Sequence, residues 1–414
     1  MSRDEKHALL SFLAGCADRV FELQQAMTAL QGLGPDNGGD GEQKKAEYLE
    51  SWLRSFGIDD IEHVDAPDSR VSSGKRPNLI VRVPGRTDRT LWILGHLDVV
   101  PAGEESLWRS DPWTVTRDKN DPDLIYGRGV EDNQQAVVCG CLLAAALKEK
   151  GIVPDMGLGL ILVSDEETGN AYGIQHIFRE RPNFVSKNDI VLVPDSGSAD
   201  GAFIETAEKG ILWMRVEVEG LQCHASRPDE GKNALKAAAA MILGASDVEA
   251  SFTARDPLFA PARSTFTPTK HEANVPNVNT IPGKEVFYVD CRVLPCYSLD
   301  EVLSAFRLLA EKVAAQYGVS VTVEKFMEEP AAAPTAENSA VVTGLKKAVK
   351  EVLGVECRCG GIGGSTVAVN FRERGIPAAV WALIFENCHA PNEAARLSFA
   401  VKEAQVFASM LFND

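Results

Sequence analysis

Short, almost wholly apolar runs alternate with segments of helix-like spacing in the first part of the chain. Such runs are typical of strands covered on both faces, as in a parallel sheet between layers of helices. The pattern predicts strands at residues 78–83, 90–94, 157–163 and 189–193. Apolar residues at helical spacing predict helices at residues 4–33, 42–56 and 136–149. Strands that alternate with helices indicate an α/β sandwich.

The pattern changes after about residue 210. Residues 212–219 alternate apolar with other side chains, which predicts a strand of a sheet with one solvated face. Further elements of this unit are predicted at residues 233–244, 285–292, 299–317 and 319–324. A linker at 329–334 precedes a helix at 339–353 and a buried strand at 378–384. We therefore predict an α/β domain of residues 1–209 and 327–414, with an α+β domain of residues 210–326 inserted into it.

Composition narrows the class of protein. Of 414 residues, 45% are hydrophobic and 24% are charged, which is typical of a globular protein. The net charge of −17 would repel phosphate backbones, so we expect no nucleic-acid partner. The apolar run at residues 136–147 is too short to cross a membrane, and the N-terminus lacks the pattern of a signal peptide. Nine scattered cysteines suit reduced thiols, so we predict a cytoplasmic protein with no membrane partner.

A histidine and an aspartate, His96 and Asp98, directly follow the predicted strand at residues 90–94. Side chains alternate along a strand, so both residues would point the same way. A nearby carboxylate can hold the second ring nitrogen of a metal-binding histidine. Seven histidines and 59 acidic residues predict about one His-x-acid triplet by chance. The triplet gains weight from its place at a strand end, where open α/β sheets put their sites.

Three more carboxylates lie next to predicted elements. Asp132 directly precedes a buried helix, where aspartate is also a favoured N-cap, and that alternative stays open. Glu166 and Glu167 follow the strand at residues 157–163. Consecutive carboxylates usually form a solvated turn, but a bound cation is another way to offset their repulsion.

Asp195 and His389 complete the pattern, because each follows another predicted strand of the larger domain. Two histidines and three carboxylates suit a pair of zinc ions, which accept both nitrogen and oxygen ligands. Two metals about 3.5–4 Å apart form a recurring kind of hydrolytic centre. The sequence thus predicts a two-metal site at the strand ends.

Four motifs together resemble one family of zinc enzymes. This family contains acetylornithine deacetylase, succinyl-diaminopimelate desuccinylase, aminoacylase and related carboxypeptidases and dipeptidases. The resemblance runs from about residue 40 to the end of the chain. The motifs are Gly95-His-Leu-Asp-Val-Val-Pro101, Gly127-Arg-Gly-Val-Glu-Asp132, Asp165-Glu-Glu-Thr-Gly169 and His224-Ala-Ser-Arg-Pro-Asp-Glu-Gly231.

The resemblance implies a zinc-exopeptidase-like α/β/α sandwich that holds two Zn(II) ions, with Co(II) or Mn(II) as substitutes. It implies that the ligands are His96 and Asp195 on one ion, Glu167 and His389 on the other, and Asp132 between both. Asp98 would orient His96, and Glu166 would act as general base. It also implies a cis peptide bond between Asp132 and Asn133.

The inserted domain would be the family's lid and dimerisation domain, which implies a homodimer. Asn279 and Arg292 match positions that bind substrate, and His224 matches a lid histidine that reaches an active site. The glycine-rich stretch at residues 360–366 lacks the lysine of a phosphate-binding loop. In this family an equivalent stretch lines the pocket for the substrate carboxylate, which assigns Gly363 and Gly364 to substrate binding.

The chain departs from the family pattern at two places. Many members have Lys-Gly after the bridging aspartate, where this chain has Asn133-Gln134-Gln135. The desuccinylase branch carries arginine and serine where this chain reads Glu208-Lys-Gly-Ile211. The second difference argues against succinyl-diaminopimelate as the substrate. Within the family's activities we expect a deacylase for small N-acyl amino acids, with a dipeptidase or carboxypeptidase acting on short peptides as the alternative. A non-catalytic binding protein on the same fold is a third interpretation, but such proteins usually lose ligands and none of the five positions is altered here.

Overall fold

The computed structural model describes residues 3–412, and the chain divides into two compact units. Unit 1 comprises Met1–Thr206, Thr335–Cys359 and Thr366–Asp414. Unit 2 comprises Ala207–Pro334 and Gly360–Ser365. The short segment at residues 360–365, which was predicted to lie in the larger domain, thus belongs to unit 2.

Unit 1 is built on an eight-stranded sheet. Its order is β1 (Ile61–His63), β4 (Leu79–Val83), β8 (Gly157–Val163), β5 (Thr90–His96), β9 (Ile190–Gly197), β18 (Ala378–Ala382), β10 (Phe203–Glu208) and β17 (Arg358–Ile362). β8, β5, β9 and β18 run parallel, whereas β4 and β10 pair antiparallel to their neighbours. The carboxyl ends of the parallel strands therefore meet at one edge of the sheet.

Alternate side chains of the central strands enter two separate hydrophobic cores. In β5, Leu91 and Ile93 belong to one core, whereas Trp92 and Leu94 belong to the other. The other parallel strands divide in the same way. This division explains why the strands read as continuous apolar runs rather than as alternating ones.

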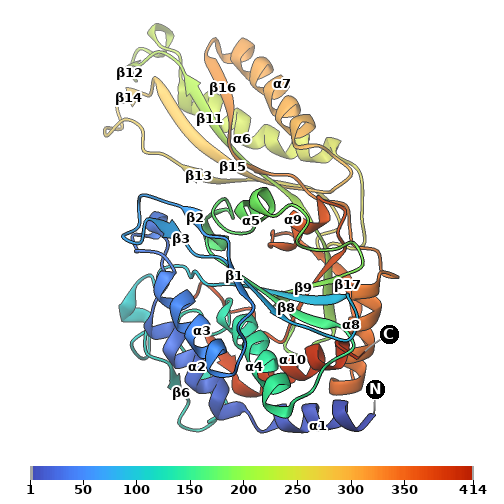
Figure 1. Ribbon diagram of the computed structural model, residues 1–414. Coiled ribbons are helices and arrows are strands. Elements are labelled where there is room, and N and C mark those ends of the chain that lie inside the picture. The colour runs from blue at the N-terminus through green and yellow to red at the C-terminus, as the bar shows by residue number, and fades with distance from the viewer. Residues whose placement is uncertain (1–2, 413–414) are drawn as a thin grey trace. The chain divides into compact units, whose positions relative to one another are not determined.

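Helices cover both faces of this sheet (Figure 1). One face carries α1 (Arg3–Ala14), α2 (Ala17–Ala29), α3 (Gln43–Ser55), α4 (Gln134–Lys150), α8 (Ala340–Leu353) and α10 (Leu397–Met410). The other carries α5 (Ile174–Glu180) and α9 (Ala368–Arg372). The α/β sandwich predicted from the sequence is thus confirmed.

Short strands complete unit 1. They are β2 (Ala66–Pro67) paired with β3 (Lys75–Arg76), and a sheet of β19 (Ala394–Arg396), β7 (Leu124–Tyr126) and β6 (Thr116–Arg117). The pairing of β7 with β19 brings together two segments far apart in sequence. Among residues 3–412, no helix is both long and apolar enough to cross a membrane.

Unit 2 is a four-stranded antiparallel sheet with helices packed on one face. The order is β13 (Thr265–His271), β15 (Lys284–Val293), β11 (Gly210–Glu219) and β16 (Ser320–Glu329). The helices α6 (Ala234–Ser251) and α7 (Leu299–Tyr317) share a core with the inward side chains of the strands. A two-stranded ribbon of β12 (Cys223–His224) and β14 (Thr280–Ile281) belongs to the same unit.

Several element boundaries differ from the predicted ones. The helix predicted at residues 4–33 is two helices, because the chain turns at Gly15 and Cys16 between α1 and α2. The strand predicted at 189–193 extends to Gly197, so Asp195 lies within β9. β13 was not predicted, since Thr265–His271 contains a proline and mostly polar residues.

Asp189 joins the amino ends of two parallel strands. Its carboxylate accepts hydrogen bonds from the backbone N–H groups of Thr90 at 2.9 Å and Ser186 at 2.8 Å. It also accepts one from the indole N–H of Trp92 at 3.0 Å.

We expect Asp189→Asn to destabilise unit 1 by about 1–3 kcal/mol, because the new amide NH₂ would face one of these N–H donors. Denaturant unfolding followed by tryptophan fluorescence would measure the shift. An unchanged unfolding midpoint would show that these bonds do not hold the strand ends.

Candidate metal centre

The parallel strands of unit 1 place the predicted ligands at one edge of the sheet. His96 is the last residue of β5, Asp195 lies near the end of β9, and Glu166 and Glu167 begin a 3-10 turn (Glu166–Thr168) just after β8. His389 lies in the loop that follows β18. Asp132 directly precedes Asn133, the N-cap of α4, so the N-cap interpretation of Asp132 is wrong.

The carboxylate of Asp132 lies between the two histidines. Its Oδ1 is 2.9 Å from Nε2 of His96, and its Oδ2 is 3.1 Å from Nε2 of His389. The peptide bond between Asp132 and Asn133 is cis, as the family resemblance implied. One carboxylate therefore presents a separate oxygen to each histidine.

The remaining carboxylates extend the cluster on both sides of Asp132. Glu167 Oε2 lies 3.1 Å from His389 Nε2, and Asp195 Oδ1 lies 3.8 Å from His96 Nε2. Two overlapping sets of side chains bring their ligand atoms within 4.8 Å of one another. They are His96, Asp132 and Glu167, and His96, Glu166 and Asp195.

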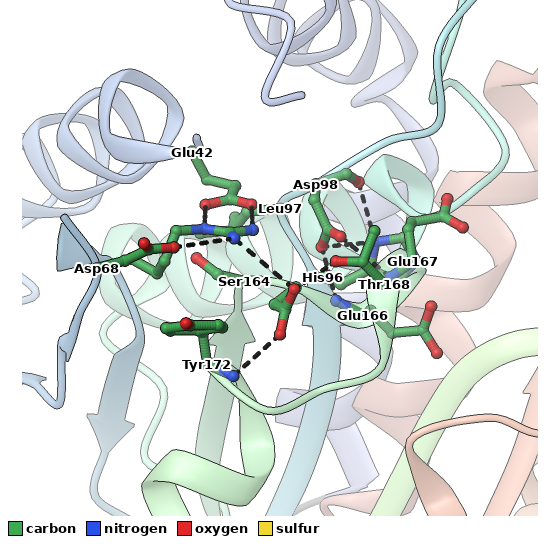
Figure 2. Close-up of polar contacts among 12 residues, drawn as sticks. Glu42, Asp68, His96, Leu97, Asp98, Ser164, Glu166, Glu167, Thr168 and Tyr172 are labelled. Carbon is green, nitrogen blue, oxygen red and sulfur yellow. Dashed lines mark hydrogen bonds and ion pairs between the residues drawn. The ribbon is translucent and has the colours of Figure 1, made fainter. Parts of the chain in front are cut away.

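Asp98 connects the end of β5 to the turn after β8 (Figure 2). Its two carboxylate oxygens accept hydrogen bonds from the backbone N–H groups of Glu166 at 3.1 Å and Glu167 at 3.0 Å. The Nδ1 of His96 is 3.0 Å from the main-chain carbonyl of Asp98 and 3.5 Å from its carboxylate. Since a carbonyl only accepts, Nδ1 donates, and Nε2 faces the cluster.

A buried ionic network supports the 3-10 turn of Glu166–Thr168. Arg76, Glu42 and Asp68 are buried, and the guanidinium of Arg76 donates to both oxygens of Glu42. The carboxylate of Asp165 lies 3.7 Å from Arg76 and accepts hydrogen bonds from the hydroxyl of Thr168 and, at 2.9 Å, the N–H of Tyr172. These contacts hold the turn that carries Glu166 and Glu167.

Asn133 is a supporting residue whose role was not predicted from the sequence, where it stood only as a departure from the family pattern. Its side-chain amide donates to the carbonyl of Pro194 and to Oδ1 of Asp195, both at 2.7 Å. Its oxygen accepts the backbone N–H of His96 at 3.3 Å. The start of α4 is thereby tied to β5 and β9, and a polar residue at a buried helix start was the signal for this role.

The electrostatics of the cluster fit a bound cation. Burial raises the pKa of Glu166 well above its usual range, and it raises the pKa of Glu167 to about 7. Hydrogen bonds with Asp132 and Glu167 raise the pKa of His389 to about 10. Burial opposes protonation of His96, but bonds with Asp132, Asp195 and Asp98 outweigh it and raise its pKa. Without metal, the negative carboxylates thus keep the histidines protonated. A bound cation would supply the positive charge in place of those protons.

An unpaired oxygen supports this fit. Within residues 3–412, the Oε1 of Glu167 is a buried atom with no hydrogen-bond partner. Leaving a buried carboxylate oxygen unpaired costs free energy unless a ligand satisfies it. Two imidazoles and several carboxylates are donors that zinc and other divalent ions accept.

Unit 2 contains the other predicted site residues. Arg292 forms a two-point ion pair with Asp290 at 2.8 and 2.9 Å, and its Nη1 donates to the carbonyl of Gly363 at 2.9 Å. The indole of Trp213 donates to the same carboxylate of Asp290 at 2.7 Å. Gly363 and Gly364 form the bend that follows β17.

His224 and Asn279 lie at the ribbon of β12 and β14. The carbonyl of Asn279 accepts the N–H of Ala225 at 2.9 Å. The backbone N–H of Ser226 donates to Nδ1 of exposed His224 at 3.1 Å. Because Nδ1 accepts this bond, the proton of the neutral ring is on Nε2, which is then a donor.

Comparisons with known proteins agree with this arrangement. Residues 92–413 match the model of peptidase family M20/M25/M40. An uncharacterized metallohydrolase of Methanococcus maripaludis is 35% identical over 95% of this chain and 99% of its own length. A succinyl-diaminopimelate desuccinylase of a Nitratiruptor species is 25% identical over 95% and 99%. The solved structure of a dipeptidase from Saccharomyces cerevisiae has the same fold, with a TM-score of 0.75, 16% identity and 98% coverage of both chains.

The family match covers most of the chain, and the metallohydrolase relative covers nearly all of it. Enzymes of this kind use divalent metal ions, and the side chains clustered around Asp132 are suitable ligands. The chain therefore belongs to peptidase family M20/M25/M40 and is a metallohydrolase.

Proposed function

We propose that this enzyme hydrolyses the amide bond of small N-acyl amino acids at a centre of two zinc ions. The position of Asp132 carries the proposal, because its two oxygens face His96 and His389 separately. A carboxylate in this position suits two ions that share one ligand. The two relatives named above, a metallohydrolase and a desuccinylase, support a hydrolase for small acylated substrates.

The family resemblance gives the proposed ligand sets, and the distances are compatible with them. They are His96, Asp195 and Asp132 for one ion, and Glu167, His389 and Asp132 for the other. When bound, the two ions would lower the pKa of a water molecule and polarise the amide carbonyl.

Glu166 is the proposed general base. It lies beside the ligands without forming the close contacts to histidine that Glu167 forms. Burial raises its pKa, and a carboxylate of raised pKa is a stronger base when it is ionised. Glu166 would take a proton from the attacking water and pass it to the leaving amine.

Two residues of unit 2 are proposed to bind the substrate. The Nε2 proton of His224 suits a hydrogen bond to the oxygen of the tetrahedral intermediate. Arg292 would bind the substrate carboxylate. Since an arginine has five N–H donors and three are bonded to Asp290 and Gly363, two are left for this role.

One feature of unit 2 weighs against succinyl-diaminopimelate as the substrate. Lys209 lies in the stretch where desuccinylases carry arginine and serine. Its ammonium donates to the carbonyls of Pro261 and Arg263 at 2.8 and 2.7 Å, and the residue is buried. The ammonium of Lys209 is therefore engaged by backbone carbonyls and is not positioned to bind a succinyl carboxylate. We propose that the substrate carries a smaller or less acidic acyl group.

We further propose that the enzyme is a homodimer in which unit 2 is the lid and dimerisation domain. The exposed position of His224 suits a residue that acts at a second subunit's site. The family resemblance supports the assignment.

Glu166→Gln is expected to retain zinc but to lose about 10²–10⁴ in kcat, because a general base handles the proton without holding the ion. His96→Ala and Asp132→Ala are expected to lose both zinc and turnover. Metal content and kcat measured on each purified variant test the roles. If Glu166→Gln binds less zinc than Glu167→Gln, the two glutamates have the opposite roles.

A panel of N-acetyl amino acids, N-succinyl amino acids and dipeptides, assayed with the zinc-loaded enzyme, tests the reaction. We expect the highest kcat/KM for an N-acyl amino acid with a free carboxylate, since that group is the partner of Arg292. A preference for dipeptides would identify a metallo-exopeptidase instead. The absence of turnover in a protein that binds two zinc ions would favour a binding protein.

Complementation tests the dimer. Glu166→Ala and His224→Ala should each be nearly inactive, and refolding them together makes half of the dimers mixed by random pairing. In a mixed dimer one site combines an intact Glu166 with an intact His224 from the neighbour. Activity should then recover to roughly a quarter of wild type, if the sites act independently. Mixed dimers on a native gel without recovered activity would contradict action across subunits.

A further inference from the structure

Two buried carboxylates outside the proposed ligand set connect the loops that carry Asp132 and His389. Glu131 is 4% exposed and Glu393 is fully buried. Glu131 lies one residue before Asp132, and Glu393 lies four residues after His389. Each directs its carboxylate to the backbone of the other loop.

Glu393 bonds the loop of Asp132. One carboxylate oxygen accepts the backbone N–H groups of Glu131 at 2.9 Å and Asp132 at 3.0 Å. The other accepts the N–H of Gly129 at 2.9 Å and the guanidinium of Arg128 at 2.7 Å. One side chain therefore accepts three backbone N–H groups of the Asp132 loop.

Glu131 forms the reverse connection. Its two oxygens accept the backbone N–H groups of Phe385 and Asn387, the latter at 2.9 Å. The side-chain oxygen of Asn387 in turn accepts the N–H of Ala394 at 3.2 Å, which closes the His389 loop on itself. The antiparallel pair of β7 and β19 joins the bases of the same two loops.

We propose that Glu131 and Glu393 are positioning residues that set the separation of the ligands Asp132 and His389. The inference rests on the proposed metal centre. His389 Nε2 and Asp132 Oδ2 lie 3.1 Å apart, close enough to serve one ion together. Zinc–ligand distances vary by only about 0.2 Å, so a small slip of one loop past the other would open the site.

The two residues should differ in what their loss does. Glu131 holds the loop of His389, and His389 is a proposed ligand of only one ion. Loss of the Glu131 carboxylate should therefore weaken zinc binding at one site. Glu393 holds the backbone of Asp132, which both ions share, so its loss should weaken both sites. A purely structural role would not produce this difference.

The experiment measures zinc content and the affinity of each site by competition with a chromophoric chelator. Glu131→Gln keeps the shape of the side chain but turns an NH₂ group toward one backbone N–H. We expect one zinc to bind about 10–100-fold more weakly and the other to bind as in wild type, since this is the usual effect of losing a group that orients a ligand. Glu393→Gln should lower the zinc affinity of both sites.

Asp189→Asn is the matched control. Asp189 is also a carboxylate that accepts two backbone N–H groups in unit 1, but at the opposite ends of the strands. It should lower the unfolding midpoint of the metal-free protein and leave both zinc affinities unchanged. Glu131→Asp retains the charge with a shorter reach, and it should lose less zinc affinity than Glu131→Gln.

The outcomes separate the inference from the function on which it rests. Wild-type protein that binds no zinc would overturn the proposed metal centre itself. Wild-type protein with two zinc ions, together with a Glu131→Gln variant of the same two affinities, would overturn the positioning role alone. If Asp189→Asn lost zinc affinity in proportion to its loss of stability, the effect of Glu131→Gln would be one of general stability and the positioning role would be wrong.

Discussion

The position of the Asp132 carboxylate is the constraint on which the rest of the site depends. Its oxygens must face two histidines from different parts of the chain, one at the end of β5 and one in the loop after β18. The backbone therefore has to bring the start of α4 against the carboxyl edge of the parallel sheet. Asn133, the N-cap of α4, does this through side-chain hydrogen bonds to both β5 and β9.

The same cluster explains why the site suits a cation. Each carboxylate in a buried position costs free energy in its charged form, and neighbouring carboxylates add to that cost. Asp132 is an exception, because bonds with His389 and His96 outweigh burial and hold its pKa well below the usual range. The histidines can do so only while they carry protons, and a divalent ion would replace those protons with a charge that does not depend on pH.

Much of unit 1 could be predicted because its strands are buried on both faces. The apolar run of β8 matches its predicted bounds, and so does the amphipathic helix α7 of unit 2. The carboxyl ends of parallel strands meet at one edge, so the ligand positions followed from the strand order without any contact being known. β13 was missed because its polar residues and proline lack the periodicity on which the prediction depended. The supporting roles of Arg76, Glu131 and Glu393 depend on partners far away in sequence, which no local pattern reveals.

The ligands are held in two ways, depending on whether each lies on a strand or in a loop. His96 and Asp195 lie on strands, where hydrogen bonds of the sheet already fix the main chain. Asp132 and His389 lie in loops outside the large sheet, so backbone N–H groups of these two loops need acceptors from elsewhere in the chain. The carboxylates of Glu131 and Glu393 provide those acceptors, and they do so across the gap between the loops rather than within each one. Loops tolerate more sequence change than strands do. A site of this kind can therefore keep its strand-borne ligands fixed while its loop-borne ligands depend on a few buried side chains.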